Sequence, residues 1–178
     1  MDQCLEFSVV IPVYNRSGLL KRAIDSVLKQ TYKYFELIIS DDASTEDIEG
    51  VVSDFKDDRI KYIRLTQNKG NAAARNAGVY AATNEWIAFL DSDDTYETDF
   101  LQTMFDVCKM GSEKTGFWWC GIKVVNEMNE VQKEGCWKPA VPLNSKYSLF
   151  YGLHIGTDRK STRLNSSHSS VSRMPSSA

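Results

Sequence analysis

Residues Trp86–Asp94 read WIAFLDSDD, an uninterrupted apolar run followed by three carboxylates within four residues. The run Trp86–Leu90 has no polar alternation, which is typical of a central strand in a parallel sheet that is covered on both faces. The acids therefore stand where this strand ends. In open α/β sheets, ligands gather at the carboxyl ends of the strands. The stretch predicts an α/β fold with a ligand site beside Asp91, Asp93 and Asp94.

The close spacing of these acids indicates a bound cation. Like charges at this distance repel one another unless a cation or a shared proton compensates. An oxygen-only ligand set favours Mg²⁺ or Mn²⁺ over Zn²⁺, and Mg²⁺ typically binds one or two carboxylates together with the phosphates of a substrate. A simpler role is also open, because Asp93 or Asp94 could cap the helix that is expected to begin near Glu97.

The composition is that of one globular domain, with 178 residues of which 42% are apolar. No apolar run approaches the roughly 20 residues of a membrane helix, and the N-terminus has no basic region followed by an apolar core. The four cysteines are dispersed and form no CxxC pair, so we expect reduced thiols. The net charge of −3 disfavours a nucleic-acid binder.

The composition changes after Thr157. Residues 158–178 lose all hydrophobic periodicity and are rich in serine and arginine, which predicts a disordered tail. Asp158–His168 can be written in codons that resemble a sequencing adapter read in frame, so we expect this tail to be non-native. Without it the chain has 17 Lys and Arg against 23 Asp and Glu, a net charge of −6. We therefore expect residues 1–157 to form a domain that is truncated on its C-terminal side.

Three units of strand and helix precede the central stretch. Their strands are expected over Phe7–Val13, Phe35–Ser40 and Ile60–Leu65. Ser17 is the expected N-cap of the first helix, and Ser44 with Asp47 has capping-box spacing before the second. The third helix is expected over about Ala72–Ala82. Four alternations of this kind predict a mostly parallel sheet that is flanked by helices on both faces.

The remaining segments are less regular. Phe117–Val125 is expected to be a fifth strand, and Tyr147–Leu153 a helix. The turn Pro12–Asn15 after the first strand contains no glycine, which argues against a dinucleotide-binding Rossmann unit and against a P-loop. Asp41 and Asp42 follow the second strand directly, where they could form a turn or contact a ligand.

Four sequence strings together resemble the family 2 glycosyltransferases, the GT-A-type enzymes that use nucleotide-activated sugars. The strings are SVVIPVYNR at Ser8–Arg16, ISDDAST at Ile39–Thr45, NKGNAAARNAG at Asn68–Gly78 and FLDSDD at Phe89–Asp94. They occur in the family's order and spacing within residues 8–94. The resemblance implies a GT-A-like fold and an inverting transfer of a sugar from a nucleoside diphosphate donor to a hydroxyl acceptor.

The resemblance also implies which residues bind the base of the donor. The segment that matches Pro12, Val13 and Tyr14 lines the nucleobase pocket in such enzymes. The acid that matches Asp42 accepts a hydrogen bond from a uracil ring N–H, which favours a UDP-sugar. These four residues are therefore expected at one end of the donor site.

The diphosphate and sugar are implied to lie beside the later acids. The acid that matches Asp91 lies near the ribose and the donor sugar, and Asp93 corresponds to the DxD acid that binds Mn²⁺ or Mg²⁺ on the diphosphate. Arg75 and Asn76 match a helix that borders the donor site. A divalent ion on the diphosphate would act as a Lewis acid and neutralise charge on the leaving group.

The acceptor side lies beyond the sequence that carries the resemblance. By the family pattern the general base comes from an acidic motif past residue 157, so the catalytic base is unknown and this chain is expected to bind the donor with little or no transfer. The implied acceptor is a saccharide or a lipid-linked saccharide. We expect a cytoplasmic protein, and a lipid-linked acceptor would bring it to the inner face of the plasma membrane as a peripheral protein.

Three other interpretations compete with a transferase. Asp91–Thr95 fits the DxDxT string of haloacid-dehalogenase-type phosphatases, with Asp91 as the nucleophile, although that string ends the first strand of its fold. A calcium-binding EF-hand loop would need glycine where Tyr96 stands, as well as an entering helix. A non-catalytic module that binds a sugar nucleotide remains the third alternative.

Overall fold

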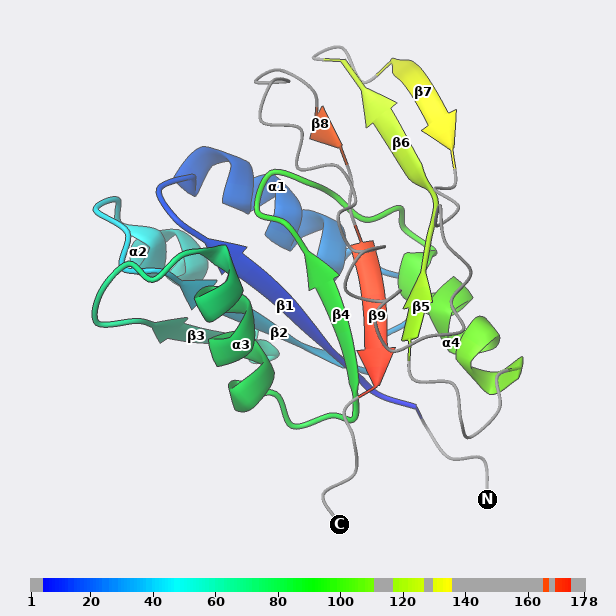
Figure 1. Ribbon diagram of the computed structural model, residues 1–178, viewed down its shortest axis with the longest axis horizontal. Coiled ribbons are helices and arrows are strands. Elements are labelled where there is room, and N and C mark those ends of the chain that lie inside the picture. Colours follow the sequence, from blue (N-terminus) through cyan, green and yellow to red (C-terminus); the bar gives the residue numbers. More distant parts are fainter. Residues whose placement is uncertain (1–4, 111–116, 127–129, 136–164, 167–168, 174–178) are drawn as a thin grey trace. The chain divides into compact units, whose positions relative to one another are not determined.

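The computed structural model describes residues 5–110, 117–126, 130–135, 165–166 and 169–173 (Figure 1). They fall into two units, one within Met1–Trp119 and Ser167–Ala178, the other within Cys120–Ser166. The first unit is built on a six-stranded sheet with the order β3-β2-β1-β4-β9-β5. The second holds a three-stranded sheet with the order β7-β6-β8.

Four parallel strands form the middle and one side of the larger sheet. They are β1 (Phe7–Val13), β2 (Phe35–Asp41), β3 (Ile60–Arg64) and β4 (Trp86–Leu90). All seven residues of β1 are buried, because it lies between β2 and β4 and both of its faces are covered. The predicted α/β fold with a mostly parallel sheet is confirmed, and the continuous apolar runs explain why β1 and β4 have the predicted bounds.

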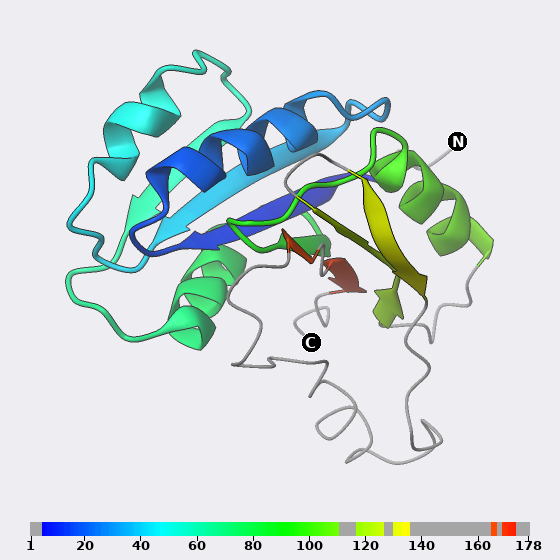
Figure 2. The same cartoon turned by 90° about the horizontal axis from the view of Figure 1, so that it is seen from above.

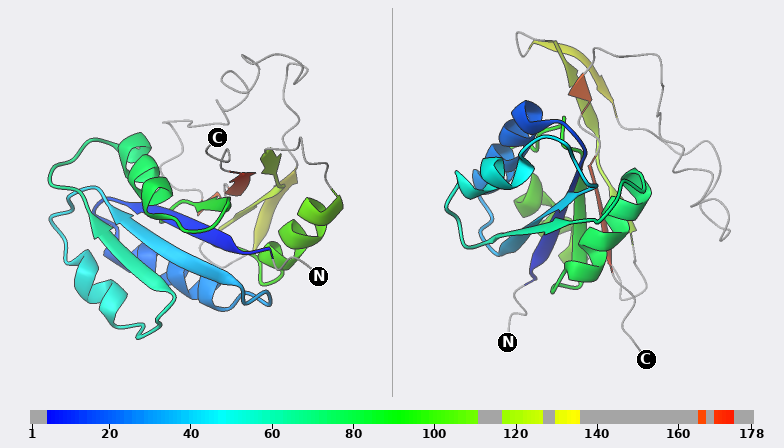
Figure 3. Two further views of the ribbon diagram at one scale, coloured as in Figure 1. Left: turned by 90° about the horizontal axis from the view of Figure 1, so that it is seen from below. Right: turned by 90° about the vertical axis from the view of Figure 1, so that its left-hand side faces the viewer.

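Helices cover both faces of the parallel strands, as Figures 2 and 3 show. α1 (Ser17–Leu28) and α2 (Ile48–Ser53) lie on one face, and α3 (Asn71–Ala81) lies on the other. α3 approaches β1 closely at Gly78, where an added Cβ would lie 2.3 Å from Val10 Cγ1. Only glycine therefore allows this packing.

The fourth helix, α4 (Phe100–Met110), is anchored to the connection between α1 and β2. The buried Gln30 side chain accepts a hydrogen bond from the Leu101 N–H at 2.9 Å, and the ring centroids of Tyr32 and Phe105 lie 4.9 Å apart. The helix begins at Phe100, six residues after Asp94 in the sequence. Asp93 and Asp94 are thus too early to be its N-cap, and the simpler capping role for these acids is wrong.

Two further capping predictions are corrected by the structure. Ser17 is the first helical residue of α1 rather than its N-cap, and its N–H donates to Glu46 Oε2 at 2.9 Å. A neighbouring loop therefore satisfies one of the free N–H groups in the first turn of α1. α2 is capped by Asp47, which accepts from the Gly50 N–H at 2.9 Å, and Ser44 takes no part in that cap.

The predicted fifth strand is two strands. β5 (Phe117–Trp119) belongs to the larger sheet, whereas β6 (Ile122–Val125) pairs with β7 (Val131–Gly135) and β8 (Asn165–Ser166) in the smaller one. The break falls at Cys120 and Gly121, where glycine weakens a strand because it offers no side chain to pack. The helix predicted over residues 147–153 lies outside the described residues.

Part of the segment expected to be a disordered tail is a strand in the structure. β9 (Ser169–Arg173) runs antiparallel to both β4 and β5 and lies between them. The exposed backbone N–H and C=O groups at the edge of β4 offer hydrogen bonds to any extended segment, which gives a physical reason for this pairing. Residues 169–173 of this segment are thus a strand in the structure, while the disorder and the non-native origin of the tail stay predictions.

Within the described ranges, none of the helices combines the length and the apolar character that crossing a bilayer requires. Cys108 and Cys120, which both lie in the described part of the chain, are free thiols. Burial raises the pKa of the Cys108 thiol to about 11. This thiol is therefore protonated and unreactive at neutral pH.

Candidate functional site

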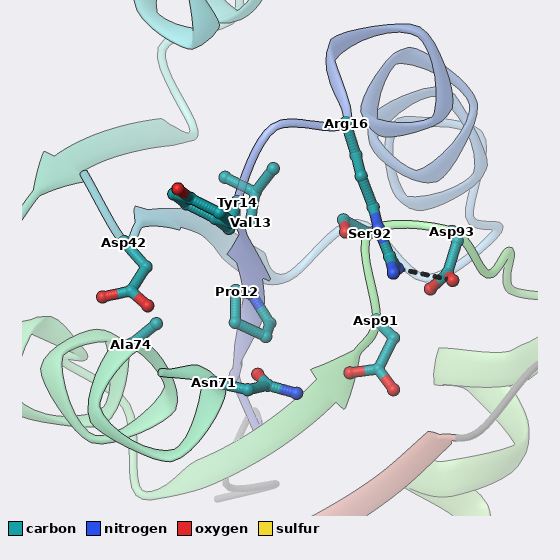
Figure 4. Close-up of a pocket in the computed structure, with 10 residues that line it drawn as sticks. All are labelled: Pro12, Val13, Tyr14, Arg16, Asp42, Asn71, Ala74, Asp91, Ser92 and Asp93. Carbon is teal, nitrogen blue, oxygen red and sulfur yellow. Dashed lines mark hydrogen bonds and ion pairs between the residues drawn. The ribbon is translucent and has the colours of Figure 1, made fainter. Parts of the chain in front are cut away.

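A pocket of about 270 Å³ lies at the carboxyl ends of β1, β2 and β4 (Figure 4). This is the edge of the sheet at which ligands bind in open α/β folds. Figure 4 shows Tyr14 and Asp42 on one side of Pro12, with Asp91 and Asp93 on the other. The lining residues are Pro12, Val13, Tyr14, Arg16, Asp42, Asn71, Ala74, Asp91, Ser92 and Asp93.

The loop after β1 is held in place by Asn15. This residue has a φ of 49°, a left-handed conformation that asparagine adopts more readily than most residues. Its side-chain Oδ1 accepts hydrogen bonds from the backbone N–H groups of Thr45 at 2.7 Å and Glu46 at 3.2 Å. These bonds tie the loop after β1 to the loop after β2. Tyr14 and Arg16, which flank Asn15, both line the pocket.

Asp42 forms the buried side of the pocket and is only 2% exposed. Its two carboxylate oxygens accept hydrogen bonds from the backbone N–H groups of Lys69 at 2.8 Å and Gly70 at 2.7 Å. Gly70 has a φ of 88°, which strongly favours glycine, and it directly precedes α3. A carboxylate has about four lone-pair sites, so Asp42 can still accept a hydrogen bond from a ligand.

Asp41, next to Asp42, has a different task. It is fully buried and accepts hydrogen bonds from Tyr62 Oη at 2.7 Å, Arg64 Nη1 at 3.2 Å and the Ser44 N–H at 2.8 Å. Burial, together with the hydrogen bond to Asp41, raises the pKa of Tyr62 to about 12. Asp41 is therefore the turn-forming acid of the pair, and Asp42 is the one that lines the pocket.

Each of the two acids after β4 that line the pocket forms an ion pair with an arginine from another element. Arg75 Nη2 lies 2.5 Å from Asp91 Oδ1, and Arg16 Nη1 lies 2.6 Å from Asp93 Oδ2. The Asp91 and Arg75 side chains are 25% and 38% exposed, whereas those of Asp93 and Arg16 are 38% and 50% exposed. Exposed ion pairs contribute only about 0–1 kcal/mol, so the Arg16–Asp93 pair is the one that breaks more readily.

The residues present fit a divalent cation that is shared with a phosphorylated ligand. Among the described residues, no group of three or more His, Cys, Asp and Glu side chains is arranged to hold a metal ion by itself. Asp93 suits a different arrangement, in which one carboxylate and the ligand's phosphates supply the oxygen atoms. Its carboxylate lines the pocket, is partly exposed and is bound only by an exposed arginine among the contacts described above.

The structure brings most of the predicted site residues together. Those that line the pocket are Pro12, Val13, Tyr14, Asp42, Asp91 and Asp93. Arg75 is not a lining residue and reaches the site through its ion pair with Asp91. Asn76 is exposed on α3 and does not line the pocket. The individual roles of all these residues stay predictions.

Four lining residues were not singled out from the sequence. They are Arg16, Asn71, Ala74 and Ser92. Each one lies inside a string that resembles the glycosyltransferases, so position within those strings was the available signal. The strings do not specify the direction of each side chain, and that direction decides whether a residue lines the pocket.

The model of one protein family, glycosyl transferase family 2, matches residues 8–155 of the chain. The chain belongs to this family. Its relatives include an uncharacterized glycosyltransferase of Rickettsia felis, which is 51% identical over 53% of this chain and 16% of the relative. Another is the UDP-Glc:alpha-D-GlcNAc-diphosphoundecaprenol beta-1,3-glucosyltransferase WfgD of Escherichia coli, 35% identical over 75% of this chain and 51% of the relative. The chain thus spans about half the length of WfgD and far less of the Rickettsia protein.

Solved structures support the GT-A-like fold. The structure of S. aureus TarS 1-349 matches with a TM-score of 0.61 and 24% sequence identity over 80% of this chain and 44% of that chain. The mannosyltransferase PcManGT from Pyrobaculum calidifontis was solved in complex with GDP-Man and Mn²⁺. It matches with a TM-score of 0.58 and 23% sequence identity over 70% of this chain and 36% of that chain.

Family membership displaces the phosphatase alternative. That interpretation required the acid string to end the first strand of its fold, whereas Asp91 follows β4, the fourth strand. Asp91 Oδ1 is also engaged by Arg75 rather than free to attack a phosphorus atom. The acids after β4 therefore have to be interpreted within a glycosyltransferase.

Proposed function

We propose that this chain is the donor-binding part of a glycosyltransferase that moves a sugar from a nucleoside diphosphate to a hydroxyl group. One observation carries the proposal: Tyr14, Asp42 and Asp93 line the same pocket at the carboxyl edge of the sheet. These residues come from three different strand ends, so the fold rather than the sequence order unites them. Family membership supplies the reaction class.

The two sides of the pocket suit the two parts of such a donor. Tyr14 is 45% exposed and offers an aromatic face for a nucleobase beside the Asp42 carboxylate, which can accept a ring N–H. Asp93 lies across Pro12 from both of them, where the diphosphate would lie (Figure 4). WfgD and a second Escherichia coli relative, WfaP, which is 43% identical over 62% of this chain and 43% of the relative, are named as UDP-Glc transferases. TarS 1-349 was solved with UDP-GlcNAc, and together these names support uridine as the nucleoside.

Asp93 would hold a divalent cation, Mn²⁺ or Mg²⁺, against the diphosphate. When bound there, the cation would supply Lewis-acid stabilisation of the charge that develops on the leaving diphosphate. Asp91, whose charge Arg75 already balances, is left to accept hydrogen bonds from ribose or sugar hydroxyls. The four parallel strands keep these groups at fixed spacing, which favours a single orientation of the donor.

The transfer itself would be a single displacement with inversion. An acceptor hydroxyl attacks the anomeric carbon, the bond from that carbon to the diphosphate breaks, and a carboxylate base removes the hydroxyl proton. We place that base beyond residue 157. The matched region covers only 51% of WfgD and 16% of the Rickettsia felis protein, which agrees with a separate acceptor-binding portion.

The acceptor we propose is a saccharide carried on a lipid diphosphate. The names of WfgD and WfaP specify such an acceptor, alpha-D-GlcNAc-diphosphoundecaprenol. An enzyme acting on it would work at a membrane surface as a peripheral protein. ExoO of Rhizobium meliloti, 38% identical over 60% of this chain, is named for succinoglycan biosynthesis, which supports a role in polysaccharide assembly.

Calorimetric titration of the full chain with UDP, with and without Mn²⁺, tests the donor site. We expect Mn²⁺ to strengthen UDP binding to the unmodified protein, and Asp93→Asn to weaken binding in Mn²⁺ by about tenfold or more because a charged ligand is lost. Asp54→Asn is the matched control, since the Asp54 side chain is 71% exposed and does not line the pocket. Equal binding by Asp93→Asn and the unmodified chain would rule out the metal assignment.

A turnover assay separates a transferase part from a non-catalytic binding module. The full chain is incubated with UDP-glucose, Mn²⁺ and a GlcNAc-diphospholipid, and the release of UDP is measured. We expect little or no release, and we expect activity once the sequence past residue 157 is replaced by that of a longer relative such as WfgD. A chimera that binds UDP but never releases it from UDP-glucose would favour the non-catalytic module.

A further inference from the structure

Arg16 holds a position that the proposed donor site leaves unexplained. It is the last residue before α1, and its backbone φ of −149° and ψ of 44° are not helical. Its side chain reaches Asp93, 77 residues away in the sequence, and both residues line the pocket (Figure 4). A guanidinium is charged at every accessible pH, so Asp93 already has a cation beside it.

This resident cation conflicts with a metal ion at the same carboxylate. Arg16 Nη1 lies 2.6 Å from Asp93 Oδ2, so a divalent ion on that oxygen would meet a positive charge at close range. The Arg16 side chain is 50% exposed and can therefore swing away without leaving a buried partner behind. A metal ion alone gives it no new partner, whereas a diphosphate does.

A comparison with the second ion pair of the site indicates that Arg16, rather than Arg75, can leave its carboxylate for a phosphate. Arg75 is more buried than Arg16, its Nε is enclosed, and Asp91 is less exposed than Asp93. Arg75 also lies over the Phe89 ring, with its Cζ 5.8 Å from the ring centroid. Arg75 is thus held by an ion pair and by an aromatic ring, whereas the ion pair of Arg16 is the more exposed of the two.

We propose that Arg16 couples metal binding to nucleotide binding. Without a donor it pairs with Asp93 and opposes binding of the metal ion alone. When a nucleoside diphosphate enters, its phosphate oxygens draw the guanidinium away, since Arg binds phosphate with paired hydrogen bonds, and Asp93 becomes available to the cation. The inference rests on the proposed function, because it needs a diphosphate in the pocket.

Mn²⁺ titrations of the full chain, followed by the electron paramagnetic resonance signal of free Mn²⁺, test the coupling with and without saturating UDP. Relative to the unmodified chain, we expect Arg16→Gln to bind Mn²⁺ alone about threefold more tightly, because the competing ion pair is gone. We expect the same variant to bind UDP in Mn²⁺ about tenfold more weakly, because a charged contact to the phosphate is lost. The enhancement of Mn²⁺ binding by UDP therefore shrinks.

Two control variants isolate the effect. Lys21→Gln also removes one positive charge, from α1. The Lys21 side chain is 53% exposed and pairs only loosely with Asp54 at 3.5 Å, so this variant should bind Mn²⁺ and UDP as the unmodified chain does. In an Asp93→Asn background, Arg16→Gln should no longer change the affinity for Mn²⁺ alone. Circular dichroism and thermal unfolding confirm that each variant is folded.

The outcomes separate the two proposals. If the unmodified chain binds UDP and Mn²⁺ jointly but Arg16→Gln leaves the affinity for Mn²⁺ alone or the enhancement by UDP unchanged, the role of Arg16 is overturned and the donor site stands. If the unmodified chain binds UDP neither alone nor together with Mn²⁺, the proposed function itself is overturned. A tighter Mn²⁺ affinity together with a smaller enhancement supports the role of Arg16.

Discussion

The two ends of the parallel strands hold their carboxylates in different ways. At the amino ends, Glu36 Oε1 accepts hydrogen bonds from Ser8 Oγ at 2.5 Å and from the Thr83 N–H at 2.6 Å. At the carboxyl ends, Asp91 and Asp93 each face a pocket and are bound by arginine side chains. The first arrangement is closed, since its donors belong to neighbouring strands and their connections, while the second leaves acceptor oxygens facing a hollow.

This difference separates acids that stabilise the fold from acids that are available to a ligand. Glu36 links β1, β2 and the segment before β4, so losing its charge should lower stability and leave binding unchanged. Asp93 contributes little to stability because its ion pair is exposed. Asp42 stands between the two cases, since it fixes a loop and lines the pocket.

The largest combined effect is expected for Asp42→Ala. The substitution leaves the backbone N–H groups of Lys69 and Gly70 without their charged acceptor, which should lower the free energy of unfolding by about 3 kcal/mol. The loop before α3 would also lose its position, so UDP binding should fall with stability. Urea unfolding and UDP calorimetry measure the two effects.

Asp42→Asn is the matched variant for that experiment. It keeps one side-chain acceptor and the shape of the residue, so it should recover part of the stability but not the charge toward a ring N–H. If Asp42→Ala were as stable as the unmodified chain, the loop-fixing role of this carboxylate would be wrong.

Gly78→Ala tests the close packing of α3 against β1, which holds one wall of the pocket in place. The added Cβ would lie 2.3 Å from Val10 Cγ1, so the variant should lose about 2 kcal/mol of stability through overpacking. Val10→Ala in the same chain makes room, and the double variant should be less destabilised than the two single changes predict. Simple additivity in thermal unfolding would refute the contact.

Glu36→Gln should lower the free energy of unfolding by about 1 kcal/mol at pH 7 and leave UDP binding unchanged. Burial of Glu36 acts to raise its pKa, but hydrogen bonds from Ser8 and Thr83, together with Lys61, outweigh it, and the pKa lies below the usual 4.5. A lowered folded-state pKa means that this stabilisation is present above pH 4.5 and is lost as the pH falls through the folded value.

The loss of stability at acidic pH measures the contribution of the Glu36 carboxylate directly. Urea unfolding between pH 7 and pH 3 should give a shallower loss for Glu36→Gln than for the unmodified chain. Parallel curves would show that the Glu36 carboxyl has no special environment, and weaker UDP binding by this variant would break the separation between the two ends of the sheet.

The smallest effect is expected for Tyr62→Phe, about 0.5 kcal/mol at neutral pH, because Asp41 keeps its other donors. The pKa of Tyr62 is raised to about 12 by burial and by the hydrogen bond to Asp41. Its contribution is therefore complete below pH 10 and is lost as the pH rises through 12. Stability measured from pH 8 to pH 11.5 should fall more steeply for the unmodified chain than for the variant, and identical slopes would contradict this role.

The sequence was sufficient for the parallel strands because burial on both faces leaves a continuous apolar run. β1 and β4 have the predicted bounds, and the acids at the ends of β2 and β4 mark the edge where the pocket lies. Long-range partners were not predictable. The ion pair between Arg16 and Asp93 spans 77 residues, and nothing local in either motif specifies it.

The other features that the sequence did not predict have the same cause. The N–H of Ser17 has its acceptor in Glu46, 29 residues away, so a local capping rule could not find it. The pairing of β9 with β4 depends on an open strand edge rather than on the sequence of Ser169–Arg173. Local patterns predicted the elements, and contacts between distant segments decided the caps and the pocket.

The most direct test of the donor site is a crystal structure of the full chain grown with UDP and Mn²⁺, with anomalous data collected to locate manganese. We expect one manganese peak bonded to the Asp93 carboxylate and to diphosphate oxygens, the uracil between Tyr14 and Asp42, and the Arg16 guanidinium turned from Asp93 toward the phosphates. Manganese bound away from Asp93, or UDP bound outside the pocket of Figure 4, would contradict the account.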